Sequence, residues 1–484
     1  MMNGEPCQRL KQYQNKVSTM TDIKQPENLL SQLELLLGKE CVLTGDALRE
    51  RASSYWDSSP MQGIALLKPH TTEQLSAAMK LCHQFGQTVV THGGLTGCVE
   101  GATVNNQDVI ISLEKMNSIE EIDAVGSTVI VEAGVTLQYL QEAVSEQGLY
   151  FPLDLGARGS CTIGGNVATN AGGINVIRYG MMRDQVLGLE VVLADGTIMS
   201  SMNRMLKNNA GYDLKQLFIG TEGTLGIVTR VSLKLQQQTR SRNTCLVAVD
   251  DFASVTKLLS RLQGDLGAAL NAYEVMWGDY FHAVTEPGWH RAPMGRDYAF
   301  YVLLEAAGAD AEGDGPRFIA AMESAMEDGL VVDAIIPKSE SERRALWDIR
   351  EDFDAIVKPQ PTFLYDVSLP IKYMENYVAA VKQGLDKLWP QSKCYIMGHM
   401  GDGNLHLFIT PNSVGEDLHG QSDEQVYKPL EKYAGSISAE HGIGTEKKSW
   451  LLKNRSIEEL DLMKVIKRAL DPLNILNRGK IFDV

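Results

Sequence analysis

Two hydrophobic spacings alternate along the first half of the chain. Apolar residues from Leu75 to Cys82 recur at i, i+3, i+4 and i+7, and Thr71 with Gln74 forms a possible capping box in front of them. This pattern predicts a helix with one buried face. Strands are predicted at 87–90, 109–113 and 128–132, and a second helix is predicted at 137–147. The first half is therefore expected to be α+β or α/β.

The polar stretch 236–243 separates this half from a new rhythm of apolar runs. Strands are predicted in CLVAVDDF, AFYVLLEA, CYIMGH and LHLFIT. Helices are predicted at 254–263 and 455–470, of which the second is charged and amphipathic. We therefore expect a domain boundary near residue 240.

Composition narrows the classes of function. With 44% hydrophobic residues in 484, the chain can bury a sizeable core and form more than one domain. Lys and Arg number 45 against 61 Asp and Glu, so a surface with a net charge of −16 repels phosphate backbones and anionic lipid. We expect no nucleic-acid binding, and an anionic substrate must be captured by a local group of cations.

The cysteines and the first residues bear on the compartment. Seven cysteines without a CxxC pair argue against a disulfide framework and a thiolate zinc site. Residues 1–30 are polar and lack the apolar core of a secretory signal, and no later segment approaches about 18 uninterrupted apolar residues. We expect a cytoplasmic protein without a transmembrane segment. Basic residues among the first 16 positions leave a weak transit peptide as the alternative.

Three glycine-rich segments, 91–97, 163–173 and 220–226, lie within 140 residues. Glycines permit positive φ and leave backbone N–H groups bare, so a loop such as 91–97 after a strand can wrap a pyrophosphate. Tight turns of a glycine-rich fold are the alternative. The GxGxxG and GxxxxGK[ST] patterns are absent, which disfavours NAD in the usual mode and ATP hydrolysis.

A second group of residues has the chemistry of a metal site. His399 and His406 lie in the segment HMGDGNLH, and Glu440 with His441 follows downstream. Two imidazoles and a carboxylate suit Zn²⁺, and Mn²⁺ and Co²⁺ accept the same ligands. From the residues alone, the two histidines could equally be ordinary turn or strand residues.

Longer segments carry a resemblance that covers about residues 60–484: PLDLGARGSCTIGGNVATNAGGINVIRYG, VLGLEVVLADGT, NNAGYDLKQLFIGTEGTLGIVT, GHMGDGNLHL and SAEHGIGTEKK. The chain resembles the FAD-dependent D-2-hydroxy acid dehydrogenases of the vanillyl-alcohol oxidase and para-cresol methylhydroxylase type, and most closely the D-2-hydroxyglutarate dehydrogenases. The resemblance implies an α+β fold with a two-subdomain FAD-binding domain at 1–240. It also implies a substrate- and metal-binding domain with an antiparallel sheet at 241–447, and a helical C-terminal segment at 448–484 that returns to the FAD domain.

The resemblance also assigns cofactor contacts. The loop expected at the FAD pyrophosphate comprises Thr91, His92, Gly93, Gly94, Leu95, Thr96 and Gly97. The residues expected along the rest of the cofactor are Gly164, Gly165, Ala168, Thr169, Gly172, Gly173, Glu222, Ile227 and Asn477. Family members that link FAD covalently use a histidine where this loop has Leu95, so the resemblance implies non-covalent FAD.

By the same resemblance, His399, His406 and Glu440 bind the metal, His441 is the general base, and Arg350 grips a substrate carboxylate. The implied reaction removes the hydroxyl proton and passes the Cα hydrogen as hydride to flavin N5, which yields a 2-oxo acid. For Arg350, an ordinary helix-surface arginine is the alternative.

The chain departs from the D-2-hydroxyglutarate enzymes at three places where they carry polar substrate contacts. Here those positions hold Asp354, Leu364 and Phe408. A buried second carboxylate without a cation would be costly, so we expect an apolar or aromatic substrate such as D-lactate, D-mandelate or D-phenyllactate. The alternative is D-2-hydroxyglutarate, with Lys358 restoring the missing charge.

The sequence is also compatible with other functions. The protein could be an oxidase that passes electrons to O₂, or a non-catalytic flavin electron-transfer subunit. An electron-transfer flavoprotein, a quinone and a cytochrome are each compatible acceptors, and a homodimer is one compatible assembly.

Overall fold

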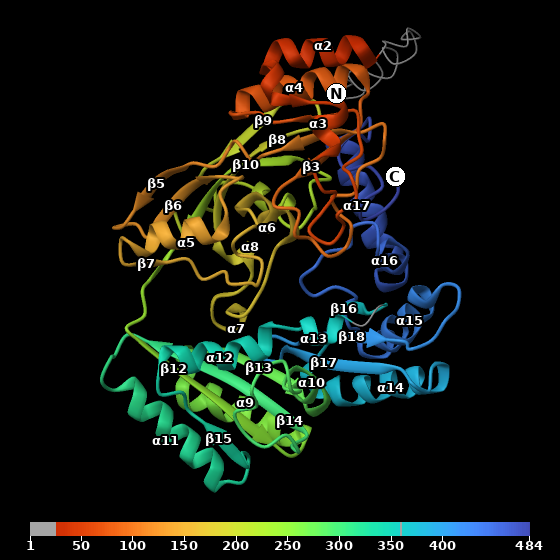
Figure 1. Ribbon diagram of the computed structural model, residues 1–484. Helices are drawn as coiled ribbons and strands as arrows, with labels where there is room; N and C mark the ends of the chain where they lie inside the picture. Colours follow the sequence, from red (N-terminus) through yellow and green to blue (C-terminus); the bar gives the residue numbers. More distant parts are fainter. Residues whose placement is uncertain (1–25, 359–360) are drawn as a thin grey trace, which may run out of the picture.

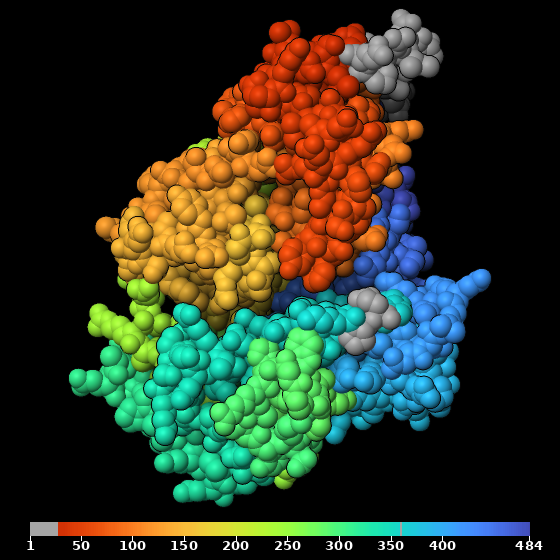
Figure 2. Space-filling view, viewed as in Figure 1, coloured from red at the N-terminus to blue at the C-terminus, as the bar shows by residue number. Residues whose placement is uncertain are grey.

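The computed structural model describes residues 26–358 and 361–484. Two halves, each built of helices and sheets, are stacked on each other, and the C-terminal helices lie at their side (Figure 1). Figure 2 shows the orange and yellow residues above the green and cyan ones, with the blue C-terminal residues beside both. Among the described residues, none of the helices has the length and apolar character needed to cross a bilayer.

The first half contains a small sheet in the order β1-β2-β4-β3. Its strands are β1 (Val42–Leu43), β2 (Ala65–Leu67), β4 (Val109–Ser112) and β3 (Val89–His92). The strands β2, β4 and β3 are parallel, and β1 is antiparallel to β2. Helices α2 (Pro26–Leu37) and α4 (Thr72–Phe85) pack together beside it.

The predicted start of α4 is correct, but its capping differs in one bond. Thr71 Oγ1 accepts a hydrogen bond from Gln74 N at 3.2 Å, as expected of an N-cap. The Gln74 side chain accepts from His70 N at 2.7 Å instead of from the N–H of Thr71. The helix ends at Gly86, whose φ of 65° is the left-handed conformation that glycine favours.

A second sheet of the first half is wholly antiparallel, in the order β5-β6-β10-β8-β9. Its strands are β5 (Ile119–Asp123), β6 (Thr128–Glu132), β10 (Ile227–Lys234), β8 (Val186–Val192) and β9 (Ile198–Ser201). The nearby helices are α5 (Leu137–Ser145), α6 (Ile163–Thr169), α7 (Val176–Tyr179) and α8 (Met182–Gln185). One hydrophobic cluster, including Met79, Val109, Val131 and Leu189, connects both sheets. The first half is therefore one core built from two subdomains.

The second half is organised by a seven-stranded antiparallel sheet, in the order β15-β12-β14-β13-β17-β18-β16. Its strands are β15 (Asp333–Ile335), β12 (Ser241–Val249), β14 (Phe300–Gly308), β13 (Leu270–Trp277), β17 (Lys393–His399), β18 (Asn404–Thr410) and β16 (Phe363–Ser368). The predicted strand at 245–252 ends early because Asp251 accepts a hydrogen bond from Ser254 N and so starts the next helix.

Helices cover both faces of this large sheet (Figure 1). One face packs on α9 (Phe252–Leu266), α11 (Asp314–Glu327) and α14 (Met374–Leu388). The other packs on α10 (Gly278–Val284), α12 (Glu340–Glu351) and α13 (Asp354–Val357). Alternate residues of a strand point to opposite faces, so Val247 and Leu246 belong to different clusters. Smaller elements include β7 (Leu149–Tyr150), β11 (Gln236–Gln237) and α15 (Leu418–Tyr427).

The C-terminal segment packs on both halves, since Trp450 and Leu460 belong to the hydrophobic cluster of the second half and Leu476 to that of the first. Helices α16 (Lys448–Asn454) and α17 (Ile457–Leu470) precede a stretch in which Leu476 forms a parallel bridge with Val89 of β3. The buried ammonium of Lys467 donates to Thr224 O at 2.8 Å and to Leu476 O at 2.9 Å. These bonds bring the end of the chain beside the glycine-rich loop that follows β3.

Candidate active site

Three potential metal ligands converge on the large sheet. His399 ends β17, His406 lies on β18, and Glu440 lies in the segment before α16. Glu440 Oε2 is 3.8 Å from the Nε2 atom of each histidine, and the three ligand atoms lie within 4.8 Å of one another. Two ligands of one tetrahedral zinc ion lie about 3.4 Å apart. The spacing is too long for hydrogen bonds and suits atoms that share a cation.

The hairpin between β17 and β18 aims both histidines the same way. In the strand register Met397 faces His406, so His399, two residues further on, has its side chain on the same face. Gly398 leaves no room for a Cβ because the backbone of Asn404 lies against it. Gly403 has a φ of 90°, which only glycine adopts readily. The GHMGDGN sequence therefore determines the geometry of the pair locally.

Glu440 connects the metal ligands to the first half. Its Oε1 accepts a hydrogen bond from Gly173 N at 2.5 Å, and a Cβ on Gly172 would overlap the same carboxylate. Both glycines belong to the segment expected to line the cofactor. The three metal-ligand candidates therefore lie where the two halves meet.

Asp366 of β16 is a site residue that sequence reasoning missed. It is fully buried, and its Oδ2 accepts hydrogen bonds from the backbone N–H groups of Ala439, Glu440 and His441 at 3.0, 2.9 and 2.9 Å. Burial alone would raise its pKa, but His441 and Lys447 together with these N–H donors hold the pKa of Asp366 well below its usual range. Asp366 thus anchors the backbone that presents both Glu440 and His441.

A second cluster, Asp366 with His406 and His441, also has ligand-like spacing. Its carboxylate already accepts three backbone N–H groups and the Asn404 amide, at 2.8 Å for the last. The positive ends of these N–H dipoles oppose a cation at the same oxygens. The first cluster is therefore the better candidate for a metal site.

Glu274 of β13 is the other buried acid that sequence reasoning missed. It is 1% exposed, and its Oε1 lies 2.8 Å from His399 Nδ1. Burial alone would lower the pKa of His399, but the charges of Glu274 and Glu440 raise it to about 9. Burial lowers the pKa of His406 well below its usual value. Two carboxylates beside His399 thus favour a bound cation, and His406 is available as a neutral ligand.

Arg350 of α12 lies in the same cluster and is 6% exposed. Its Nε donates to Glu274 Oε2 at 2.8 Å, and its Nη2 is 2.7 Å from the same oxygen. This Nη2 contact is an ion pair without hydrogen-bond alignment, so the buried N–H groups of Nη2 make no hydrogen bond among the described residues. A buried donor of this kind fits a ligand carboxylate. The surface arginine that the residues alone allowed is excluded by this burial.

The expected pyrophosphate loop begins with Thr91 and His92, the last residues of β3, and meets the chain end. Asn477 Oδ1 accepts from Thr91 N at 2.9 Å, and Asn477 Nδ2 donates to Glu222 O at 2.5 Å. Thr91 Oγ1 and His92 Nδ1 are buried without a partner among the described residues. Burial lowers the pKa of His92 to about 4. These unpaired polar atoms suit a polar cofactor beside the loop.

The glycines expected around the cofactor are packed closely. A Cβ on Gly93 would meet Thr162 Oγ1, and one on Gly94 would overlap the backbone of Ser160. Leu95 adopts a φ of 58°, whereas Gly97 has open space beside its Cα. Four further residues expected at the cofactor lie in α6, namely Gly164, Gly165, Ala168 and Thr169. Ile227 is the first residue of β10.

Glu222 accepts hydrogen bonds from the backbone that follows His441. Its carboxylate accepts from Ile443 N at 2.7 Å and Gly444 N at 2.8 Å, and burial raises its pKa. It therefore joins the cofactor side of the site to the segment that follows His441.

The four residues expected to determine substrate specificity, apart from Arg350, form two pairs. Leu364 and Phe408 face each other on β16 and β18, and Phe408 is 1% exposed between Tyr280 and Phe353. Asp354 and Lys358 are exposed and paired with each other at 3.5 Å, and the Lys358 ammonium lies over the Trp289 ring. Phe408 is thus part of a hydrophobic cluster, and the charge of Lys358 is engaged away from the histidines.

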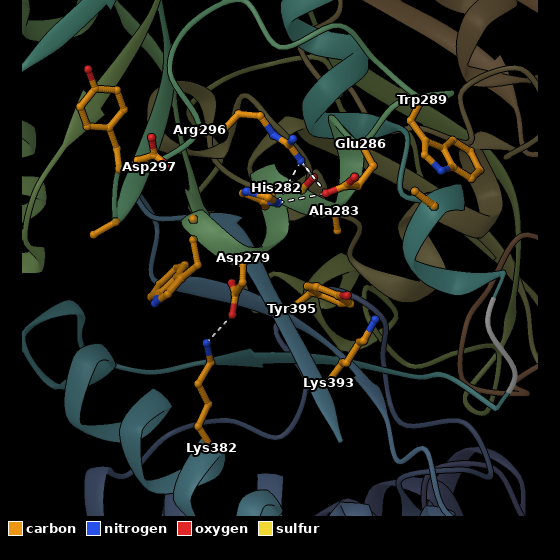
Figure 3. A pocket seen from close by; sticks show the side chains of 15 residues that line it. Asp279, His282, Ala283, Glu286, Trp289, Arg296, Asp297, Lys382, Lys393 and Tyr395 are labelled. Atoms are coloured by element: carbon orange, nitrogen blue, oxygen red, sulfur yellow. Dashed lines mark hydrogen bonds and ion pairs between the residues drawn. The ribbon is translucent and has the colours of Figure 1, made fainter. Parts of the chain in front are cut away.

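A separate hollow of about 810 Å³ opens near α10 (Figure 3). Its charged groups are largely paired: Lys382 lies 2.6 Å from Asp279, and Arg296 lies 2.7 Å from Glu286. None of the candidate metal ligands, nor His441, lines it. The candidate chemistry is therefore located elsewhere, at the junction of the halves.

Comparison with known proteins shows the class of protein to which the chain belongs. Residues 64–201 match the FAD binding domain model, and residues 238–481 match that of FAD linked oxidases, C-terminal domain. The fold is similar to that of p-cresol methylhydroxylase (TM-score 0.75, 18% identity, 94% of this chain and 97% of that one). Alkyldihydroxyacetonephosphate synthase is also similar (TM-score 0.70, 16% identity, 94% and 85%). The α+β fold of the vanillyl-alcohol oxidase type is confirmed.

The family follows from curated relatives. A mitochondrial D-2-hydroxyglutarate dehydrogenase of Bos taurus is 38% identical, over 86% of this chain and 76% of the relative. The Arabidopsis thaliana enzyme is 36% identical over 98% and 86%, and that of Xanthomonas citri 38% over 88% and 90%. The chain belongs to the D-2-hydroxyglutarate dehydrogenase family. It is an FAD-dependent D-2-hydroxy acid dehydrogenase, an oxidoreductase that acts on CH–OH groups.

The expected cytoplasmic location is wrong by the same comparison, because the Bos taurus, Arabidopsis thaliana and Rattus norvegicus relatives are named as mitochondrial. The absence of an apolar leader disfavours secretion only. It does not distinguish the cytoplasm from the interior of an organelle.

Proposed function

We propose that this protein is an FAD- and divalent-metal-dependent dehydrogenase that oxidises D-2-hydroxyglutarate to its 2-oxo acid. The observation that carries the proposal is the convergence of His399, His406 and Glu440 beside His441, with Glu440 bonded to Gly173 of the cofactor side. The names of the relatives support the choice of substrate over the apolar acids that the sequence favoured.

The residues fit both expected groups. His399, His406 and Glu440 would hold the metal, since they are two imidazoles and a carboxylate with an excess of negative charge nearby. The loop 91–97, the α6 glycines and Asn477 would hold FAD, beside the unpaired Thr91 Oγ1 and His92 Nδ1. When bound, FAD supplies a hydride acceptor and the metal supplies a Lewis acid.

The remaining steps belong to side chains of the chain itself. Arg350 would hold the substrate C1 carboxylate through its buried guanidinium, whose position is set by the ion pair with Glu274. His441 would take the hydroxyl proton as general base, and its backbone N–H is fixed on Asp366 at 2.9 Å. Burial keeps the side chains of His399, His406 and Arg350 away from bulk water.

Turnover on matched substrates tests the proposal. Dye-coupled kcat/KM would be measured on the D and L forms of 2-hydroxyglutarate, malate, lactate, mandelate and phenyllactate, with metal-replete protein. We expect D-2-hydroxyglutarate to exceed every other substrate by at least about tenfold. Equal use of L forms, or no reduction of bound FAD by any D-2-hydroxy acid under anaerobic conditions, would contradict the proposal.

A second substrate class is supported by two residues. Leu364 and Phe408 form an apolar cross-strand pair two residues from Asp366 and His406, on the face of the sheet that carries the site. A relative from Schizosaccharomyces pombe, 36% identical over 85% of this chain and 80% of its own length, is named a putative D-lactate dehydrogenase. Preference for D-lactate or D-mandelate in the same assay would favour this class.

A further inference from the structure

Two buried ion pairs connect α12 to the large sheet. Arg343 pairs with Glu305 of β14 at 3.2 Å, and Arg350 pairs with Glu274 of β13 at 2.7 Å. The two arginines are seven residues apart, which is about two helical turns, so they lie on one face of α12. Both glutamates are nearly fully buried, at 4% and 1% exposed. The two glutamates are similar in burial, but Arg343 also pairs with Glu340 at 2.7 Å, and Glu305 has Arg242 as a second cation at 3.6 Å.

The two pairs differ in the other groups that hydrogen-bond to each glutamate. The carboxylate of Glu305 also accepts from Thr244 Oγ1 at 2.8 Å and Trp347 Nε1 at 3.3 Å, so its partners are structural. Glu274 uses Oε2 for Arg350 and Oε1 for His399 Nδ1. Only the second pair touches a candidate metal ligand.

The Glu274 contact determines which nitrogen of His399 is free. A carboxylate accepts and does not donate, so His399 Nδ1 must carry the proton in this hydrogen bond. In the neutral imidazole that a metal ligand requires, the lone pair is then on Nε2, which lies 3.8 Å from Glu440 Oε2. A carboxylate that fixes a ligating imidazole in this way orients the ring and raises its basicity.

We propose that Glu274 is a positioning residue that serves the metal ligand His399 and the substrate-binding Arg350 at the same time. The proposal rests on the proposed metal and substrate roles of those two residues. Arg350 and His399 are both hydrogen-bond donors to Glu274. Among the side chains, only a carboxylate offers each donor an oxygen of its own. Metal affinity and substrate affinity are therefore coupled through one side chain.

Glu274→Gln is the direct test because an amide has one oxygen and one NH₂ group. If the oxygen faces Arg350, the NH₂ opposes His399 Nδ1–H; if it faces His399, the NH₂ opposes Arg350. We expect the Zn²⁺ dissociation constant of the FAD-loaded, metal-depleted protein to rise by about 10- to 100-fold. We also expect KM for the 2-hydroxy acid to rise, and the visible spectrum of the Co²⁺-loaded protein to change.

Glu305→Gln is the control variant. It removes the carboxylate that pairs with Arg343, the other arginine on this face of α12, so it should lower the melting temperature while Zn²⁺ affinity and the Co²⁺ spectrum stay as in the wild type. If Glu274→Gln binds Zn²⁺ as tightly as the wild type, or if Glu305→Gln weakens it as much, the inference is overturned. If the wild type itself binds no divalent metal, the proposed metal role fails first.

A second variant covers failure of Glu274→Gln to fold. In Glu274→Gln combined with Arg350→Met, no buried cation is left unpaired and the amide oxygen can accept from His399 Nδ1–H. We expect this double variant to regain most of the lost Zn²⁺ affinity but to keep a high KM for substrate. Zn²⁺ affinity that stays lost in a folded double variant would overturn the inference.

Discussion

The carboxylate of Asp366 accepts the backbone N–H of His441 at 2.9 Å, although the two residues are 75 positions apart. The same oxygen accepts the N–H groups of Ala439 and Glu440. Three consecutive N–H groups converging on one atom fix the backbone that carries the candidate base and one candidate metal ligand. Asp366 therefore links β16 to the chemistry without touching the reacting atoms.

Replacement of Asp366 by asparagine should lower kcat by about 10²-fold, because a misplacement of about 1 Å at the reacting groups costs this much. The amide can present its oxygen either to the 439–441 backbone or to Asn404, and it leaves the buried ammonium of Lys447 without its nearby charge. Steady-state turnover at saturating substrate checks this. Asp279→Asn, in the separate hollow, is the control, and equal losses in both variants would contradict it.

Replacement of His441 by alanine should reduce kcat by about 10²-fold or more, as expected when a general base is removed. Zn²⁺ and FAD content should be unchanged, since His441 belongs to neither proposed binding set. Turnover and bound-metal analysis on the same preparation check both parts. His419→Ala, a half-exposed histidine stacked on Phe363, is the control. Near wild-type turnover of His441→Ala would remove its proposed role.

Dialysis against a chelator should abolish turnover, and added Zn²⁺, Mn²⁺ or Co²⁺ should restore it. The FAD absorbance should persist throughout, because the loop 91–97 and Asn477 are separate from His399, His406 and Glu440. Activity and the flavin spectrum are followed in one titration. Full activity in a protein shown to be metal-free would argue against the metal site.

Acid precipitation should release the flavin into the supernatant and leave a colourless pellet. Leu95 stands where covalently linked family members have a histidine, and the neighbouring His92 has its Nε2 on Ala102 O at 2.9 Å inside the protein. Absorbance of the two fractions measures the result. A yellow pellet would mean that FAD is covalently attached.

Phe408→Ala should destabilise the protein by about 3–5 kcal/mol, the usual cost of removing a fully buried phenylalanine. Phe408 is 1% exposed and packs on Tyr280 and Phe353. Leu364→Ala, at a partly exposed position, should cost less. Denaturant unfolding of both variants decides the matter, and a small effect for Phe408 would mean that the side chain lines an open pocket instead.

The sequence alone determined the features that depend on neighbours in the chain. The N-cap at Thr71 and the glycine hairpin that places His399 beside His406 follow from spacings of a few residues. The family resemblance extended this to the α+β fold and to FAD, both of which the comparisons confirm.

Tertiary structure alone decided the partners of the buried acids. Glu274 and Asp366 are single acidic residues within apolar strands, and nothing local distinguishes them from other acids. Their partners His399 and His441 are 125 and 75 residues away, and contact depends on the register of β13, β17 and β16 in one sheet. Likewise, the sequence gives Arg350 its charge, but only the packing of α12 on β13 makes Glu274 its partner. The physical reason is that local spacing determines which face a side chain is on, whereas the cost of burying a charge is met by groups that only the complete fold brings together.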